Sequence, residues 1–545
     1  MDKIIKNNST VKKQNVFINL PPKNLENEFN NLLTNDAIEF LVNLIVEFDE
    51  RIDNLYNQRQ KSKSEFKNKP KIPRFKKLEV NDDWQVAPVC ERLKNRHVDL
   101  GDVSPSNMDH FSSALKSNVQ GIQVDFDDGH CPTWYNQILG LHNVTQVVKN
   151  NIPGVPNITE APILVLRPRA WNMIETNMSI NGKNIPGSLF DYGLLIYHNG
   201  IDLQKLKCGP AFYLSKIENS NEAKLWNDIF SWSEIYLNIP HGSIKACVLI
   251  ENILASFEME YILFELKDHS LGLNCGIWDY AASIISKFGN DKSFILPDRN
   301  KYVNMNKKFL KKYMQLVVKI CHKHGAHATG GMAAKLLPDK QNSVDYLRVL
   351  HDICDGKLSE INEGVDGFMI YDIKLVCHMN DLWKNHGGPF DNQINYPGTK
   401  ENISEEDLMS LPKGGVTMTG LDHNICVAIL FIYHWLNGNG HFIHNGSIED
   451  SATAEISRSQ IWQWNRHSTG IEDSHDFINK KLIKKRVDIN LIYIKNINSF
   501  NYDDAGKLSI AVDLFYDLIY AREFPEFITS YIYNVYPFKK IQSHL

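Results

Sequence analysis

The chain has 545 residues and a formal net charge of -5, from 59 Lys and Arg against 64 Asp and Glu. This length exceeds one ordinary core and predicts two or three domains, or one large α/β barrel with flanking helical parts. The balance of charge excludes a broad basic surface that would neutralise a phosphate backbone, so we expect no nucleic-acid partner.

The cysteine pattern and the apolar runs narrow the class of protein further. The nine cysteines are scattered, odd in number and never spaced as CxxC, which argues for a reducing compartment and against a disulfide framework or structural zinc site. The longest apolar run, 425–436, is 12 residues, shorter than the roughly 20 of a spanning helix. We expect a buried helix there and no membrane span.

The first part of the chain, 1–95, is predicted to be an arm followed by a helical clasp. Residues 1–17 are basic without the apolar core of a secretory signal, and we expect a flexible arm. Apolar residues recur at helical spacing over 24–66. The basic, proline-containing stretch 67–77 then indicates an extended connection.

The second part, 96–385, consists of short apolar runs separated by longer, partly helical segments. The runs are apolar on both faces until their C-terminal ends, as parallel strands covered by helices are. Eight such runs predict an α/β fold, a (β/α)8 TIM barrel, with a doubly wound open sheet as the alternative. The strand candidates are 98–103, 121–127, 163–169, 212–217, 244–252, 271–279, 327–334 and 366–372.

The last two parts are a loop and a helical region. Residues 386–420 are rich in Gly, Pro, Asn and Asp, which indicates a long exposed loop. Residues 421–545 carry helical patterns without a series of strands, and predict a C-terminal helical domain.

Charged side chains stand where several predicted strands end. Alternation along a strand places Asp125 and Asp127 on one face. Carboxylates buried at one rim would repel each other unless a cation neutralised them, and oxygen-only ligands suit Mg2+ with open positions. Any one of these acids alone is more often a helix cap or part of a surface ion pair. The charged residues at strand ends are Asp125, Asp127, Asp128, Arg167, Arg169, Glu251 and Asp279.

Several longer motifs carry a family resemblance. They include LRPRAW at 166–171, LGLNCGIWDY at 271–280 and IEDSATAEISRSQIW at 448–462, together with VDFDD at 124–128. With these motifs the chain resembles malate synthase of the shorter A-type form, from about residue 83 to 525. The resemblance implies a (β/α)8 barrel with an N-terminal helical clasp and a C-terminal helical domain that closes over the barrel mouth.

The resemblance also implies a reaction, the Mg2+-dependent condensation of acetyl-CoA with glyoxylate, followed by hydrolysis to malate and CoA. By motif position, Glu251 and Asp279 are implied magnesium ligands, and Arg167 is the implied catalytic arginine. Asp450 is the implied base that removes a proton from the methyl group of acetyl-CoA.

Four further positions follow from the same resemblance. The backbone amides of Trp278 and Asp279 are implied to hold the glyoxylate carboxylate, and Asp125 and Asp127 to hydrogen-bond waters on the metal. Cys275 is not accompanied by the His and Asn signature of a cysteine nucleophile, so we expect it to be a packing residue.

The sequence departs from the family pattern at several places. Ile277 stands where the family has Arg, and Asp127 where it usually has Glu. Tyr371 and Asp372 replace a His-Pro turn near the acetyl-CoA channel, which puts cofactor affinity in question. Two alternatives therefore stand beside an active enzyme. One is an inactive paralogue that acts as a binding or regulatory protein, and the other is a barrel lyase that handles malyl-CoA-type thioesters without hydrolysis.

The tripeptide Ser543-His544-Leu545 is a variant of the peroxisomal address Ser-Lys-Leu. Together with the family resemblance it predicts a peroxisomal or glyoxysomal enzyme that an import receptor recognises, with the cytoplasm as the alternative.

Overall fold

The structure is a computed structural model of the chain, and it describes residues 14–68, 71–79, 83–341, 343–472, 474–497 and 502–536. The predicted address at 543–545 lies outside the described residues, as does most of the predicted N-terminal arm. Within these ranges, the helices are all too short or too polar to cross a membrane.

Eight parallel strands close into a barrel in the order β10-β11-β2-β3-β4-β7-β8-β9. This closure confirms the predicted TIM barrel and excludes the open sheet, because β11 pairs with β2 and β9 pairs with β10. Most strands end earlier than predicted, since the polar residues that follow each apolar run bend away from the ladder. The strands are β2 Val98–Val103, β3 Gly121–Asp125, β4 Ile163–Arg167, β7 Ala211–Leu214, β8 Lys245–Leu249, β9 Ser270–Asn274, β10 Ala328–Ala333 and β11 Gly367–Ile370.

Helices between the strands cover the outside of the barrel. Seven strands of the barrel, all except β10, are buried along their whole length, as expected for parallel strands covered by helices. The covering helices are α3 Met108–Leu115, α4 Trp134–Val148, α5 Gly187–Lys205, α6 Ser220–Leu237, α7 Met259–Glu265, α8 Trp278–Phe288, α9 Arg299–Tyr302, α10 Lys308–Lys323, α11 Val344–Asn362 and α12 Val376–His386. Short 3-10 turns lie at Glu91–Leu93, Ala255–Phe257, Lys292–Phe294 and Ile373–Leu375.

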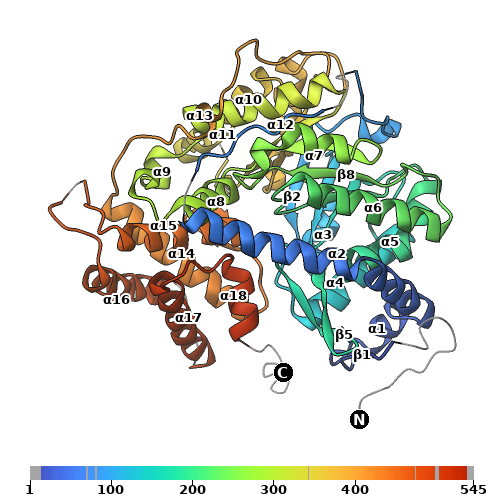
Figure 1. Ribbon diagram of the computed structural model, residues 1–545, viewed down its shortest axis with the longest axis horizontal. Helices are drawn as coiled ribbons and strands as arrows, with labels where there is room; N and C mark the ends of the chain where they lie inside the picture. The colour runs from blue at the N-terminus through green and yellow to red at the C-terminus, as the bar shows by residue number, and fades with distance from the viewer. Residues whose placement is uncertain are drawn as a thin grey trace.

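The N-terminal part clasps one side of the barrel. The predicted helical segment forms α1, Glu26–Leu32, and α2, Asn35–Asn68, and α2 packs across α5, α6 and α8 (Figure 1). The prediction of a flexible arm over 1–17 is wrong for its last two residues, because they belong to β1, Val16–Ile18, which pairs with the edge of a small sheet. That sheet, completed by β5 Ile174–Ile180 and β6 Lys183–Pro186, is an insertion after β4. Its short, half-buried strands are too weakly patterned to be recognised in the sequence.

The C-terminal helices gather beside the barrel (Figure 1). The apolar run 425–436 lies within the buried helix α14, as predicted. The helices are α14 Met418–Leu436, α15 Ser451–Arg466, α16 Lys480–Ile497, α17 Tyr502–Tyr520 and α18 Ile528–Val535, whereas the short α13 Glu405–Leu408, within the predicted loop, packs against α10. A hairpin of β12, Phe442–His444, and β13, Ser447–Glu449, was not expected in this region. It leads directly into α15, which packs against α8 at the barrel mouth.

Candidate active site

Arg167 occupies the last position of β4 and gathers the acids that follow β3. Its guanidinium donates to Asp127 Oδ2 at 3.2 Å and to Asp128 Oδ2, and lies 3.5 Å from Asp125 Oδ2. Its Nε donates to Ser215 Oγ at 2.7 Å. We predicted that strand alternation would place Asp125 and Asp127 on one face. Asp127 lies beyond the strand, because β3 ends at Asp125 and the chain bends after it. Asp127 and Asp128 therefore both reach Arg167.

Three buried carboxylates converge at the same rim. One oxygen from each of Asp128, Glu251 and Asp279 lies within 4.8 Å of the other two. The two predicted metal ligands are thus brought together, and Asp128 joins them. The only feature of the sequence that pointed to Asp128 was its place in the VDFDD motif, and the motif did not distinguish it from the neighbouring Asp127.

Lys216 lies among these carboxylates and was missed in the sequence. Its Nζ is 2.8 Å from both Asp127 Oδ2 and Asp128 Oδ1, and 3.7 Å from Asp279 Oδ2. Its backbone has φ +54°, a left-handed conformation uncommon for lysine. The backbone N–H of Lys216 also donates to Glu251 Oε1 at 2.7 Å, so this residue links β7 to β8. Only the fold reveals it, because a lysine after an apolar run is usually solvated.

Burial and neighbouring carboxylates raise the pKa values of the acids in this cluster, whereas Arg167 and Lys216 lower them. Burial raises the pKa of Glu251 and that of Asp279, and neighbouring carboxylates add to the increase. Burial also raises the pKa of Asp125, to about 6. For Asp128, burial is outweighed by Arg167 and Lys216, which hold the pKa of its carboxyl below the ordinary value. The rim is therefore a site of concentrated negative charge that cations stabilise.

Asp450 comes from outside the barrel and closes this site. It is the N-cap of α15, where its carboxylate accepts from Thr453 N at 2.9 Å. The next residue, Ser451, donates through Oγ to Asp128 Oδ1, which ties α15 to the barrel rim. Burial and the nearby Asp128 raise the pKa of Asp450. A raised pKa in a fixed carboxylate suits a proton acceptor.

A second buried acid, Asp102, lies close to Asp450 and was also missed. It stands near the end of β2 with φ +53°, and its Oδ2 is buried without a hydrogen-bond partner. Burial, with Asp450 next in importance, raises its pKa well above the ordinary value. In the sequence it is an unremarkable aspartate in VDLGDV.

Trp278 and Asp279 begin α8, so their backbone amides belong to the first turn, where no helical acceptor is available. The guanidinium of Arg299 lies 5.0 Å from the centre of the Trp278 ring and fixes the start of this helix. A cavity of about 130 Å³ opens in front of these groups. Residues lining it include Asp128, Arg167, Glu251, Trp278, Asp279 and Asp450.

Comparison with known proteins assigns the family. Residues 163–411 match the family model "Malate synthase, TIM barrel domain", and 415–535 match "Malate synthase, C-terminal". Malate synthase of Myxococcus xanthus is 36% identical, over 93% of this chain and 94% of its own. The chain belongs to the malate synthase family. Malate synthase of Dictyostelium discoideum is 35% identical, over 92% of this chain and 94% of its own. Glyoxysomal malate synthase of Glycine max is 36% identical, over 84% of this chain and 83% of its own.

Three residues that depart from the malate synthase pattern, Ile277, Tyr371 and Asp372, lie at the end of α8 nearest the cavity and at the end of β11. Ile277 is the N-cap of α8 and lines the cavity, so an apolar side chain borders the site where the family has Arg. Tyr371 bonds through its hydroxyl to His441 Nε2 at 3.1 Å. Asp372 accepts from Leu337 N at 2.8 Å. Tyr371 and Asp372 thus join the end of β11 to His441 and to Leu337.

Cys275, next to the metal-ligand motif, is buried, and burial raises the pKa of its thiol. This environment is that of a packing residue, as predicted, since a reactive thiol needs an environment that favours the thiolate.

Proposed function

We propose that this chain catalyses the Mg2+-dependent condensation of acetyl-CoA with glyoxylate and the hydrolysis of the product to malate and CoA. The observation that carries the proposal is the convergence of Asp128, Glu251 and Asp279 with Arg167 and Asp450 on one buried cavity. The malate synthase family assignment supports it.

The donor set fits magnesium. Asp128, Glu251 and Asp279 offer only carboxylate oxygens, the ligands of a hard cation, and burial makes their common ionisation costly without one. We propose that these three residues hold Mg2+, with Lys216 as the fixed positive charge beside them. When bound, Mg2+ would polarise the aldehyde carbonyl of glyoxylate.

Asp450 is the proposed base. The amide of Thr453 fixes its carboxylate, and its raised pKa improves its match to a weak carbon acid such as the methyl group of acetyl-CoA. Loss of that proton places negative charge on the thioester oxygen. Arg167, held in place by Ser215 and by the acids after β3, supplies a permanent positive charge for it.

Glyoxylate is oriented by the start of α8. The first-turn amides of Trp278 and Asp279 are suited to its carboxylate, since N–H groups at a helix N-terminus bind anions. Asp125 and Asp127 remain the proposed partners of water ligands on the metal. They also hold Arg167, with Asp127 3.2 Å from its guanidinium.

The domain organisation belongs to this proposal. We assign 1–95 to the clasp, 96–385 to the barrel, 386–420 to a loop and 421–545 to the C-terminal helical domain. Because Asp450 and Ser451 come from the last part, the site is complete only when that part is docked, which would couple closure to catalysis.

A turnover assay tests the proposal. Purified protein is expected to release CoA from acetyl-CoA only with glyoxylate and Mg2+ together, and Asp450→Asn is expected to lower kcat by at least about 100-fold. Asp291→Asn is the matched control, because Asp291 also caps a helical turn, by accepting from Ser293 N at 2.9 Å, but lies away from the cavity. Well-folded protein without turnover would favour an inactive paralogue, and a persisting acyl-CoA product would favour a lyase.

A peroxisomal or glyoxysomal location is also proposed, supported by the glyoxysomal relatives of this family. The proposed address is Ser543-His544-Leu545. A fluorescent protein that ends in this tripeptide should enter peroxisomes, and the same fusion ending in Ser-His-Ser should stay in the cytoplasm.

A further inference from the structure

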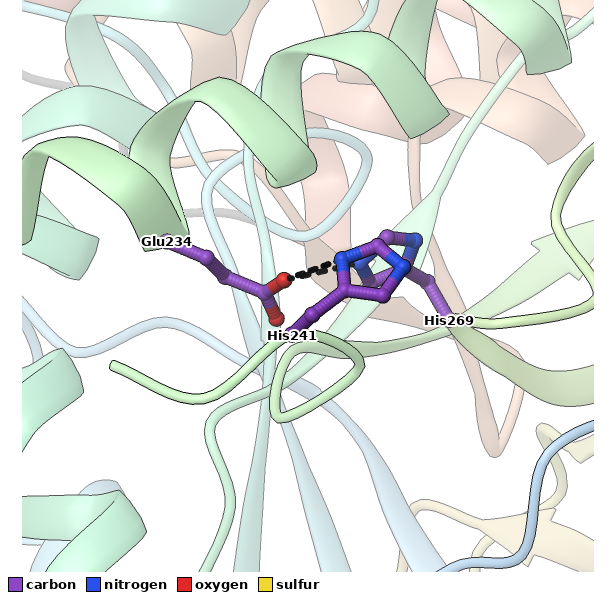
Figure 2. A group of neighbouring side chains, drawn as sticks. All are labelled: Glu234, His241 and His269. Atoms are coloured by element: carbon purple, nitrogen blue, oxygen red, sulfur yellow. Dashed lines mark hydrogen bonds and ion pairs between the residues drawn. The ribbon is translucent and has the colours of Figure 1, made fainter. Parts of the chain in front are cut away.

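A second group of metal-ligating side chains lies away from the cavity. Glu234, His241 and His269 each offer one ligand atom, and the three atoms lie within 4.8 Å of one another. Figure 2 shows both imidazole rings directed at the same carboxylate oxygen. His241 Nδ1 and His269 Nε2 are each 3.1 Å from Glu234 Oε2.

The carboxylate is anchored and ionised. Glu234 Oε2 accepts from Gly242 N at 2.9 Å, and Oε1 accepts from Ile244 N at 2.9 Å. Burial would raise the pKa of Glu234, but His269 and the two backbone amides together hold it below the ordinary value. Glu234 is thus a negative charge at a fixed position, and its Oε2 atom faces one nitrogen of each imidazole ring.

The outer nitrogen of His269 has a partner typical of a metal ligand. Its Nδ1 lies 2.8 Å from Asn227 Oδ1. An amide oxygen at this place accepts from Nδ1–H, so when Nε2 gives up the proton it shares with Glu234, the neutral ring keeps the tautomer that binds a metal through Nε2. Histidines that bind metals usually donate their other N–H to an oxygen in this manner. On the outer side of His241, the carboxylate of Asp268 lies 3.9 Å from Nε2.

We propose that Glu234, His241 and His269 form a Zn2+ site with three protein ligands. Two imidazoles and one carboxylate suit zinc rather than a hard cation such as Mg2+, which prefers oxygen ligands alone. Zn2+ would replace the two imidazole contacts with Glu234 Oε2, while the bonds from the two backbone amides remain. Binding displaces the proton from each imidazole nitrogen that faces the carboxylate.

Two of the three distances between the ligand atoms need only a small adjustment. In a tetrahedral site with bonds of about 2.0–2.1 Å, ligand atoms lie about 3.3 Å apart. The two oxygen–nitrogen distances, both 3.1 Å, need to open by only a few tenths of an ångström. His241 can follow because its side chain is 61% exposed, and its solvent side offers a fourth position for water.

The site joins three segments at the rim opposite the proposed active site. Glu234 is in the last turn of α6, His241 is in the loop before β8, and His269 directly precedes β9. Glu251 and Asp279 follow the other ends of β8 and β9. In TIM barrels the N-terminal rim serves stability, whereas catalytic groups lie at the C-terminal rim. Bound zinc therefore stabilises the barrel and leaves the reaction unaffected. The scattered cysteines gave no sign of it, because this site uses none of them.

Metal binding to the full-length protein tests this inference. With Mg2+ in large excess to occupy oxygen-only sites, calorimetry should show one Zn2+ bound per chain, and binding should raise the Tm. His241→Ala should weaken Zn2+ binding at least about 10-fold. His351→Ala, which removes another exposed histidine beside a carboxylate, Asp355 at 3.2 Å, should bind like the unmodified chain.

Two further measurements separate this site from the proposed active site. Co2+ in place of Zn2+ should give the visible absorption of a tetrahedral nitrogen–oxygen site, lost in His241→Ala and kept in Asp279→Asn. CoA release should be unchanged in His241→Ala. The inference is overturned if Zn2+ binds equally well to the chain and to His241→Ala, if no Zn2+ binds, or if Asp279→Asn removes the Co2+ signal.

Discussion

Asp128→Asn gives a direct test of how many carboxylates form the magnesium site. The sequence indicated two ligands, Glu251 and Asp279, whereas the structure adds Asp128 within 4.8 Å of both. Asparagine has nearly the same shape and keeps one oxygen acceptor for Arg167, but it removes the charge and replaces the oxygen that accepts from Lys216 and Ser451 with an amide group. The matched control is Asp127→Asn, because Asp127 contacts the same two cations, Arg167 at 3.2 Å and Lys216 at 2.8 Å, but lies outside the cluster.

The magnitude follows from the charges. Two unit charges 4 Å apart interact by about 4 kcal/mol at an effective dielectric constant of 20, and a divalent ion doubles this value. Dehydration of the ion and relaxation of the site offset most of it, which leaves roughly 2 kcal/mol. That energy corresponds to a roughly 30-fold loss of Mg2+ affinity. For Asp127→Asn we expect a change of less than about 3-fold, since only a neighbouring charge is removed.

The assay is CoA release as a function of Mg2+ concentration, with circular dichroism as the check on folding. Asp128→Asn should need roughly 30 times more Mg2+ for half-maximal rate. Equal Mg2+ requirements in Asp128→Asn and the unmodified chain would refute the three-carboxylate site. A larger effect in Asp127→Asn would transfer the role to Asp127.

Four further outcomes are expected. Because burial raises the pKa of Asp450, turnover should fall as the pH is lowered, with a midpoint above the roughly 4 of a free aspartate; full activity at pH 4 in folded protein would contradict this. Asp102 has a raised folded pKa, so its ionisation costs stability as the pH rises above about 4. Asp102→Asn should raise the Tm at pH 7.5 by roughly 2 °C or more and have little effect near pH 3, as thermal unfolding would show. Gly272 has φ +98°, and a β-carbon there would lie 1.9 Å from His327 O, so Gly272→Ala should cost at least about 3 kcal/mol in denaturant unfolding. Gly356→Ala, in open space on α11, should instead stabilise by about 0.5–1 kcal/mol.

Much of the barrel could be predicted because parallel strands covered by helices have continuous apolar sequences. All eight predicted strands are present, and polar residues such as Arg167 mark where they stop. The small sheet that begins with β1 and the hairpin that leads into Asp450 could not be predicted. Their strands are three to seven residues long and gain stability from partners far along the chain, so local periodicity is too weak to show them.

The site divides in the same way. Charged residues at the ends of predicted strands were sufficient to indicate a metal-dependent centre, and the motifs around Arg167, Glu251 and Asp279 carried the resemblance to the family. Lys216 and Asp102 required the tertiary structure, since their roles depend on left-handed backbone at strand ends and on contacts with other strands.

The sequence by itself therefore determined the order of the strands along the chain and the chemical type of the residues at their ends. Barrel closure alone decided which of those residues meet, because it sets which strands are neighbours and at what register. Closure brings Asp128 to Glu251 and Asp279 at one rim, and the pairing of β8 with β9 brings His269 to Glu234 and His241 at the other. The distances within each group therefore depend on where the closed barrel places the ends of its strands.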